Sequence, residues 1–524
     1  MRMIQNKKLP ELKSKWKDGI FFASMVVLFG LLLFSRIYKL DELQQGLAID
    51  EVGSAYDAFS LSHYGVDRWE KSWPVYPNNH GNGMSAMHTF LLAALFKILP
   101  MNLWTVRTPV VLFSILNWIF GILIMKELSE NNKTAQYLAA LVMTVCPIFV
   151  LTSRMGLDCY LMLGGSTVLL WSFIRLYKDN SAKWYFISGL FSGLFLYTYV
   201  ITYIVLPLFL VAIFFMMILV KRMSWKKLLL FFLPPLLFLA IPLILEQMIN
   251  LLDLQEIKLW IFTIPKMNGY RSDEIGHFSL DNMDQVIKAV FWGEESGNNM
   301  ITGYMPCYAI SVLFFGMGMF SYLKKIVQCF RERKICTYGI VFFYFMICIL
   351  ALSFVQEPNV HKCIGAYSAY GLIAAEGLLY FCENIGLKKT ALVLVSGVYL
   401  LCFVKFERYY LFHYPLEISP SPYCEYDQTD AVEFIVNNEK ICNKITYTSA
   451  DILYVAYATQ ISPQEYNART EAQDLDLWKC GKLVEISREF NYIVSTDFQE
   501  YAQQLRQEGF YEEKFEHYSV FYTE

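Results

Sequence analysis

Long apolar runs follow one another through most of this sequence, and they constrain its fold more than any other feature. They cover roughly 20–38, 84–100, 106–125, 134–152, 159–174, 184–201, 203–220, 228–246, 304–323, 336–354, 363–382 and 389–406. Most are long enough for a helix to cross a hydrocarbon layer about 30 Å thick. With 56% hydrophobic and only 17% charged residues, the chain has the composition of an integral membrane protein. The net charge of −3 gives no indication of nucleic acid binding.

Basic residues between the runs predict the topology. The N-terminal segment 1–19 is basic, and later clusters occur at Arg175/Lys178/Lys183, Lys221/Arg222/Lys226/Lys227 and Lys324/Lys325/Arg331/Arg333/Lys334. If every run crossed the membrane, these clusters would lie opposite the N-terminus, against the positive-inside rule. The run 84–100 is short, carries Lys97 and ends at Pro100, so we expect it to lie in the membrane interface. The remaining runs give about eleven spans with a cytoplasmic N-terminus.

This topology divides the chain into three parts. The cytoplasmic segment 1–19 precedes a transmembrane domain over 20–406, whose main outer loops are 39–105 and 247–303. From residue 407 the sequence is polar, and β-rich runs at 444–448, 492–494 and 518–522 alternate with expected helices at 430–437 and 498–508. We therefore expect a small extracytoplasmic α/β domain over 407–524. The predicted fold class is an α-helical polytopic membrane protein with this domain attached.

Ionisable residues gather on the predicted outer side, whereas the middle of the spans is almost free of them. The acidic pair Asp50-Glu51 directly follows the first run. Carboxylates at the edge of a bilayer usually face water or serve a site, although Asp50 could also cap a helix beginning at Glu51. A transporter or flippase for lipid-linked glycans would be expected to carry charges near mid-membrane. The pattern therefore favours an outer-surface enzyme, with a non-catalytic envelope scaffold as a further alternative.

Several motifs occur in a fixed order on this outer side. They are Asp50-Glu51, the interfacial stretch 83–99, the segment 104–109 with Arg107, the segment 146–158 with Arg154 and Asp158, Trp184 with Gly189, Gly193 and 197–199, and the segment 359–362. In this order the sequence resembles the GT-C glycosyltransferases, in the branch of protein O-mannosyltransferases and lipid A aminoarabinose transferases. It departs from them at Asn82-Gly83-Met84, where a Pro-Pro pair is frequent, and at Lys362, where arginine is more usual.

The resemblance implies an inverting transfer of a sugar from a polyprenyl-phosphate donor to an acceptor hydroxyl, at the outer face of the plasma membrane. The acceptor would be a glycan, a lipid or a protein. Deprotonating its hydroxyl needs a base, and we expect Asp50 in that role. Glu51 would orient a neighbour or hold the loop, and Asp158 would be a second acid.

The departing phosphate needs positive charge. The outer candidates are Arg107, Arg154, Arg271, His361 and Lys362, although arginines at span ends also snorkel to lipid headgroups. His80 and Tyr199 are expected to contact the acceptor or the sugar. No cofactor is expected; a divalent metal held by Asp50, Glu51 and His80, as in oligosaccharyltransferase relatives, is the alternative.

Overall fold

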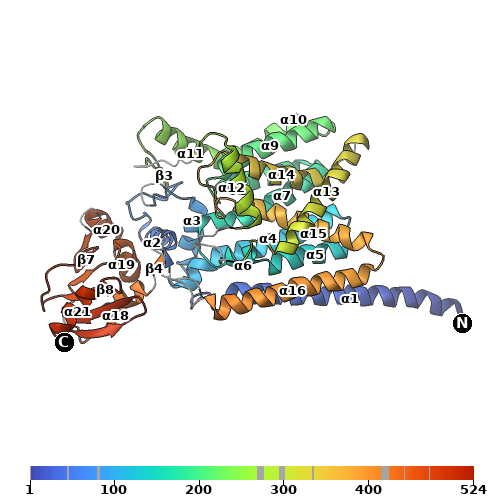
Figure 1. The fold of residues 1–524 in the computed structure, drawn as a ribbon. Helices are drawn as coiled ribbons and strands as arrows, with labels where there is room; N and C mark the ends of the chain where they lie inside the picture. Colours follow the sequence, from blue (N-terminus) through green and yellow to red (C-terminus); the bar gives the residue numbers. More distant parts are fainter. Residues whose placement is uncertain are drawn as a thin grey trace.

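The computed structural model describes residues 2–43, 47–79, 83–267, 276–293, 301, 303–332, 336–414, 424–425, 427–441, 443–470 and 473–523. Side chains are described from residue 18 onward, except at 424–425. A helical bundle forms the larger part, and a smaller sheet domain lies at the end opposite the start of α1 (Figure 1).

The bundle is built from helices that coincide with the apolar runs. They are α1 (Arg2–Ile37), α4 (Leu103–Leu128), α5 (Lys133–Val145), α6 (Pro147–Leu151), η1 (Asp158–Tyr160), α7 (Leu161–Asp179), α8 (Ala182–Leu196), α9 (Thr202–Leu219), α10 (Trp225–Lys227), η2 (Leu228–Phe232), α11 (Leu233–Leu251), α13 (Ala309–Glu332), α14 (Tyr338–Leu352), α15 (Ile364–Asn384) and α16 (Lys388–Phe412).

Within the described residues, seven helices are long and apolar enough to cross a membrane, by length and composition. The expected spans at 134–152, 184–201, 336–354 and 363–382 correspond to α5 with α6, α8, α14 and α15, which fall outside that group. The polytopic helical fold class is thus confirmed, while the number of crossings stays a prediction.

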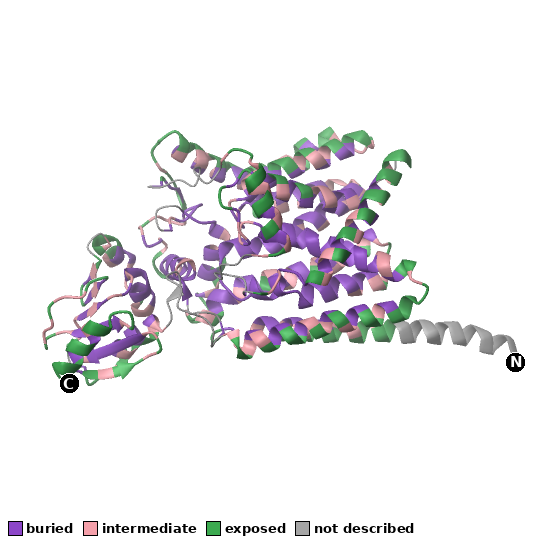
Figure 2. Ribbon diagram, viewed as in Figure 1, coloured by how far each residue is buried: buried purple, intermediate pink, exposed green. Residues whose placement is uncertain are grey.

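Apolar side chains fill the interior of the bundle and also cover its outer surface, as expected for a protein surrounded by lipid. The interior is continuously buried, and exposed residues lie on the outer helix surfaces (Figure 2). Large apolar side chains such as Phe238 and Leu401 are 79% and 71% exposed, as expected for surfaces that contact lipid. Helices approach closely at glycines: a Cβ on Gly377 would lie 1.7 Å from the Phe314 carbonyl oxygen. Such contacts are typical of membrane helix packing.

The basic clusters meet at the cytoplasmic end predicted for the bundle. Arg175 and Lys178 both pair with Glu127 at the end of α4. Lys227 donates to the Asn180 carbonyl oxygen, which ties the following loop to the end of α7. Lys133 pairs with Asp18 of α1. These contacts place the clusters at 175–183 and 221–227 together, at the end from which α1 enters the bundle (Figure 1).

Shorter elements cover the opposite end. They are β1 (Leu47–Ala48), α2 (Ile49–Tyr64), α3 (Ala86–Leu95), β2 (Ile257–Leu259), β3 (Phe262–Ile264) and α12 (Leu280–Phe291). Helix α3 has ten residues and is too short to cross a bilayer, which agrees with the interfacial helix expected there. Strand β1 pairs with β4 (Cys424–Glu425), so the chain after α16 returns to the start of α2.

The C-terminal domain has the expected α/β character. Its elements are α18 (Gln428–Asn437), β5 (Thr446–Thr448), α19 (Ile452–Thr459), α20 (Pro463–Arg469), β6 (Asp474–Leu475), β7 (Trp478–Cys480), β8 (Asn491–Ser495), α21 (Gln499–Gln507), β9 (Tyr511–Lys514) and β10 (Tyr518–Tyr522). The six-stranded sheet has the order β6-β7-β5-β8-β10-β9. Strands β5 and β8 are parallel, whereas β8 and β10 are antiparallel.

The sheet has an apolar core on each face. Ile493 and Val520 are cross-strand partners and belong to a buried cluster that also contains residues of α19 and α2. Their neighbours Tyr492 and Phe521 point to the other face, where they pack with Leu505 of α21. This alternation follows the two-residue period of a strand. One face of the domain is thereby joined to α2, the helix that carries the acidic pair.

Candidate active site at the start of α2

Helix α2 begins at Ile49, two residues earlier than a cap at Asp50 would require. Its N-cap is Ala48, in extended conformation, so Asp50 and Glu51 both lie in the first turn. Glu51 reaches back, and its Oε2 accepts the Ala48 N–H at 3.1 Å, which satisfies one of the open backbone donors of the helix. The alternative in which Asp50 caps the helix is therefore wrong. The capping contact comes from Glu51, and Asp50 is left for another purpose.

Glu51 lies in a closed ion pair. Both its side chain and that of Arg107 on α4 are completely buried. Arg107 Nε donates to Oε1 at 2.9 Å, and Nη2 donates to Oε2 at 3.2 Å. The Gly156 N–H also donates to Oε1, at 2.5 Å. Glu51 thus joins α2, α4 and the loop before η1.

Arg107 has a different role from the expected phosphate contact. Its Nη1 donates to the Leu40 carbonyl oxygen at 2.6 Å, in addition to the two bonds with Glu51. A guanidinium without exposed surface and with these partners does not present its charge to a ligand in this arrangement. Arg107 instead fixes the segment after α1 against α2.

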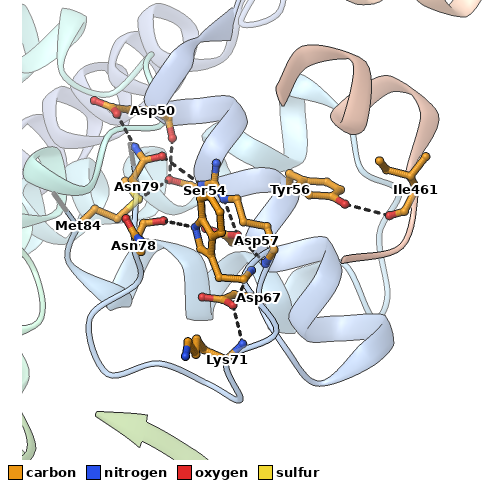
Figure 3. A network of polar contacts seen from close by, with 12 residues as sticks. Asp50, Ser54, Tyr56, Asp57, Asp67, Lys71, Asn78, Asn79, Met84 and Ile461 are labelled. Atoms are coloured by element: carbon orange, nitrogen blue, oxygen red, sulfur yellow. Dashed lines mark hydrogen bonds and ion pairs between the residues drawn. The ribbon is translucent and has the colours of Figure 1, made fainter. Parts of the chain in front are cut away.

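Asp50 lies in a more open environment than Glu51. It is half-buried, and among the described residues only Asn79 donates to its carboxylate, from Nδ2 to Oδ1 at 2.6 Å (Figure 3). Asn79 Oδ1 in turn accepts from Arg68 Nη2 at 3.1 Å. Arg68 forms a two-point ion pair with Asp57, with both nitrogen–oxygen distances 2.8 Å. The carboxylate of Asp50 is thus held by a neutral amide at the end of a buried polar chain.

Asp158 lies next to the same region. It is 9% exposed, and its Oδ2 accepts the N–H of Ser85, the N-cap of α3, at 2.9 Å. The preceding residue, Met84, contacts α2, because Ser54 Oγ donates to its sulfur at 3.4 Å. The segment 84–85 therefore links Asp158 to α2, the helix that carries Asp50. In this structure Asp158 fixes the start of α3.

The loop after α14 contacts η1, the short helix that begins at Asp158. His361 Nδ1 is 3.0 Å from the Tyr160 hydroxyl, and the two rings stack with centroids 5.5 Å apart. Burial lowers the pKa of His361 to about 4, so the imidazole is neutral at physiological pH. It can act as a hydrogen-bond partner, in contrast to the expected cation. The neighbouring Lys362 is half-buried, and its Nζ donates to the Gln356 carbonyl oxygen at 2.9 Å.

Arg154 binds the end of α1. It is 1% exposed. Its Nη1 donates to the Ser35 carbonyl oxygen, and Nη2 donates to those of Tyr38 and Lys39, at 2.8–2.9 Å. Nε donates to the Tyr410 hydroxyl at 3.0 Å. A cation at the C-terminal end of a helix is favourable. The structure thus uses Arg154 for packing α1 and α16, in place of the expected phosphate contact.

The remaining expected residues are not brought to the acidic pair by any described contact. Tyr199 is 7% exposed, in the turn after α8. The nearby Tyr197 carbonyl oxygen accepts the Met87 N–H of α3 at 3.3 Å. His80 and Arg271 lie outside the described residues. Within the described residues, no three His, Cys, Asp or Glu side chains form a candidate metal site, and Glu51 already pairs with Arg107.

The sequence interpretation missed three residues that form the chain behind Asp50, namely Asp57, Arg68 and Asn79. A signal for one of them was present: Asp57 follows Asp50 by seven residues, and this spacing puts both on one face of a helix. Nothing comparable marks Asn79, because its contact with Asp50 depends on how the loop 65–79 folds back onto α2.

The C-terminal domain packs directly beside this chain. The Tyr454 hydroxyl donates to the Leu47 carbonyl oxygen at 3.0 Å, and the Tyr56 hydroxyl donates to that of Ile461 at 3.0 Å (Figure 3). The ring of Tyr466 lies 5.3 Å from that of Tyr56 and 5.9 Å from that of Trp69, between centroids. The domain therefore closes the side of α2 that faces away from the bundle.

Comparisons with known proteins identify the fold. Residues 84–244 match the family model "Dolichyl-phosphate-mannose-protein mannosyltransferase". No individually curated protein is significantly similar in sequence. The structure is similar to that of ArnT from Cupriavidus metallidurans bound to undecaprenyl phosphate, with a TM-score of 0.57 and 10% identity over 96% of this chain and 98% of ArnT. The apo form of ArnT gives 0.55 and 12% identity over the same shares.

A second similar structure comes from an archaeon. The Archaeoglobus fulgidus oligosaccharyltransferase, in complex with zinc and sulfate, matches with a TM-score of 0.51 and 11% identity over 92% of this chain and 69% of that protein. The matches cover the bundle and, in ArnT, nearly the whole chain. This protein is therefore a membrane protein with the GT-C glycosyltransferase fold.

Proposed function

We propose that this protein is a glycosyltransferase that moves a sugar from a polyprenyl-phosphate donor to an acceptor hydroxyl, at the outer face of the membrane and with inversion. The observation that carries this proposal is the Asp50 carboxylate, which is half-buried and held by the amide of Asn79. The adjacent Glu51 carboxylate, in contrast, is paired with Arg107. The likeness to ArnT bound to undecaprenyl phosphate supports a lipid phosphate as the donor's carrier.

The proposed step needs one base. The acceptor oxygen forms a bond to the anomeric carbon while the bond from that carbon to the phosphate oxygen breaks, and the electron pair of that bond leaves with the polyprenyl phosphate. The hydroxyl proton passes to Asp50. Since Oδ1 already accepts from Asn79, we assign proton acceptance to Oδ2. General-base catalysis of this kind contributes about 10²–10⁴-fold.

The charge on the leaving phosphate needs partners in addition. With Arg107 and Arg154 bound to other groups, we assign this role to Lys362 and Arg271, and His361 would contribute a neutral N–H. His80 and Tyr199 stay candidates for sugar or acceptor contact. A glycan flippase or an envelope scaffold with this fold would not require a base at position 50.

The decisive experiment is the substitution Asp50→Asn, which keeps the shape and removes proton acceptance. Envelope glycans of cells lacking the protein are compared with those of cells complemented by the wild type, which identifies the transferred sugar. Transfer from the corresponding undecaprenyl-phosphate sugar is then measured for wild type and variant. We expect turnover to fall by about 10²–10⁴-fold with normal expression. The matched control is Asp281→Asn, an exposed aspartate in the first turn of another outer helix, α12. A fully active Asp50→Asn protein would contradict the proposed mechanism.

The outer location of the site has its own test. Single cysteines at Tyr64 and Gln507, both exposed near or in the C-terminal domain, are expected to react with a membrane-impermeant thiol reagent in intact cells. Cysteines at Lys183 and Lys226, exposed at the other end of the bundle, should react only after the membrane is opened, because their basic clusters are expected on the cytoplasmic side. Labelling of Lys183→Cys in intact cells would reverse the assignment.

A further inference from the structure

We propose that Asn79 is the positioning residue for Asp50, and that Asp57 and Arg68 set the direction of its amide. This inference rests on the proposed function, because it assigns a purpose to the polar chain behind the base. The chain runs Asp57–Arg68–Asn79–Asp50 (Figure 3). Its inner members are buried: Asp57 is 0%, Arg68 1% and Asn79 4% exposed.

The ion pair at the inner end is firmly built. Asp57 Oδ1 accepts from the backbone N–H of Arg68 at 3.1 Å and from its Nε at 2.8 Å, and Oδ2 accepts from Nη2 at 2.8 Å. Such two-point contacts fix the plane of a guanidinium as well as its distance. The same Nη2 then donates to Asn79 Oδ1 at 3.1 Å. Arg68 is therefore a rigid donor with its direction determined by α2.

This geometry decides which end of the Asn79 amide meets Asp50. A guanidinium has only donors, so the amide oxygen of Asn79 must face Arg68. The Nδ2 group is then the end that faces Asp50, to which it donates at 2.6 Å. An N–H that points at Oδ1 matches an unprotonated carboxylate oxygen, and it leaves Oδ2 to receive the proton of the acceptor.

A neutral amide also suits a base better than a cation would. Opposite charge next to a carboxylate favours its ionised form and weakens it as a proton acceptor. Glu51, with Arg107 at 2.9 Å, has that kind of partner. Asn79 transmits the position of the Arg68–Asp57 pair to Asp50 without placing a full positive charge next to it.

The backbone leaves space for this arrangement at one glycine. A Cβ on Gly53, in the first half of α2, would lie 2.5 Å from Asn79 Oδ1 and 2.8 Å from Arg68 Nη2. These distances are far below ordinary contact, so a side chain at position 53 would displace the Asn79 amide. The loop on the other side is held as well, because Trp69 Nε1 donates to the Asn78 carbonyl oxygen at 3.2 Å.

The test is a double-mutant cycle on Asp50 and Asn79 in the full-length protein. The donor is the undecaprenyl-phosphate sugar that the comparison of envelope glycans identifies. Asn79→Ala is expected to lower kcat on the order of 10- to 100-fold, since misplacing a catalytic group costs that much. The KM for the lipid donor should stay unchanged. In the Asp50→Asn background, the same substitution should cause no further loss, because there is no base left to position.

Gly53→Ala provides an independent variant, and it is expected to lower kcat with the donor KM unchanged. Its matched control is Gly30→Ala on α1, where an added Cβ meets no atom within 4 Å and activity should not change. Thermal unfolding of each variant shows whether it is folded. If Asn79→Ala does not fold, the kcat and KM of Gly53→Ala decide the question.

The results distinguish the positioning role of Asn79 from the role of Asp50 as the base. An active Asn79→Ala or Gly53→Ala protein combined with an inactive Asp50→Asn protein overturns the positioning role and leaves the base assigned. Losses that multiply in the double mutant also overturn it, because Asn79 would then act independently of Asp50. A fully active Asp50→Asn protein overturns the proposed function itself.

Discussion

Two adjacent carboxylates mark two regions of this protein that differ in almost every physical respect. The region around Glu51 is closed: the carboxylate is completely buried, pairs with a cation and accepts from two backbone amides. The region around Asp50 is open: the carboxylate is half-buried and accepts from one neutral amide. Successive residues of a helix point about 100° apart, which is enough to direct one side chain inward and the other toward the outer surface. Identical chemical groups thus become a structural element and a candidate base.

The comparison predicts opposite phenotypes, and the largest expected effect on stability is at Glu51. Glu51→Gln would leave Arg107 buried without its counter-charge, and losing one partner of a buried pair typically costs about 3–5 kcal/mol. Asn at position 50 would be half-buried like the wild-type Asp50 and could still accept from Asn79 Nδ2. Asp50→Asn should therefore change stability by less than about 1 kcal/mol. Thermal unfolding in detergent measures both. Equal unfolding temperatures for the two variants would remove the distinction between the regions.

Arg154 belongs to the closed region, which extends to the end of α1. Arg154→Ala removes donors from three backbone carbonyl groups and from Tyr410, and each buried acceptor left without a donor costs about 1–3 kcal/mol. We expect lower stability and an unchanged donor KM in the folded protein. Lys362→Ala is the counterpart for the proposed phosphate contact and should raise the donor KM without lowering stability. The reverse pattern would return Arg154 to the phosphate site.

A pH dependence of stability is expected at Asp67, next to the Asp57–Arg68 pair. Burial, and then the nearby charge of Asp57, raise the pKa of Asp67 from 3.8 to about 7. The pKa of Asp67 is lowered in turn by the backbone N–H groups of Lys71 and Trp69, which donate to Oδ1, and by the charge of Arg68. Between pH 3.8 and about 7, the folded protein therefore keeps a proton on Asp67 that the unfolded chain has released.

It follows that the contribution of Asp67 to stability falls as pH rises from about 4 to about 7, and is constant above that range. Asp67→Asn cannot ionise, so its unfolding temperature relative to wild type should increase across the same interval. A pH-independent difference for Asp67→Asn would show that the carboxyl is already ionised in the folded protein.

Much of the fold follows from local sequence patterns. The apolar runs coincide with the helices of the bundle, and the short run 84–100 contains the ten-residue helix α3. The β-rich segments of the tail overlap β5, β8 and β10. These predictions succeed because hydrophobic length and two-residue alternation are properties of a single segment. The candidate base and its position after the first span were also visible in the sequence.

The partners of the acidic pair were decided by tertiary structure alone. Glu51 and Arg107 are 56 residues apart, and Asp50 and Asn79 are 29 apart. No local pattern shows that one arginine will be sealed against a carboxylate and another against helix carbonyl groups. Arg107, Arg154 and Lys362 have the same charge in the sequence, but burial and the neighbouring acceptors determine which of them can meet a ligand. The sequence by itself determined where the charges stand along the chain, and the packing of distant segments determined which of them are open to solvent.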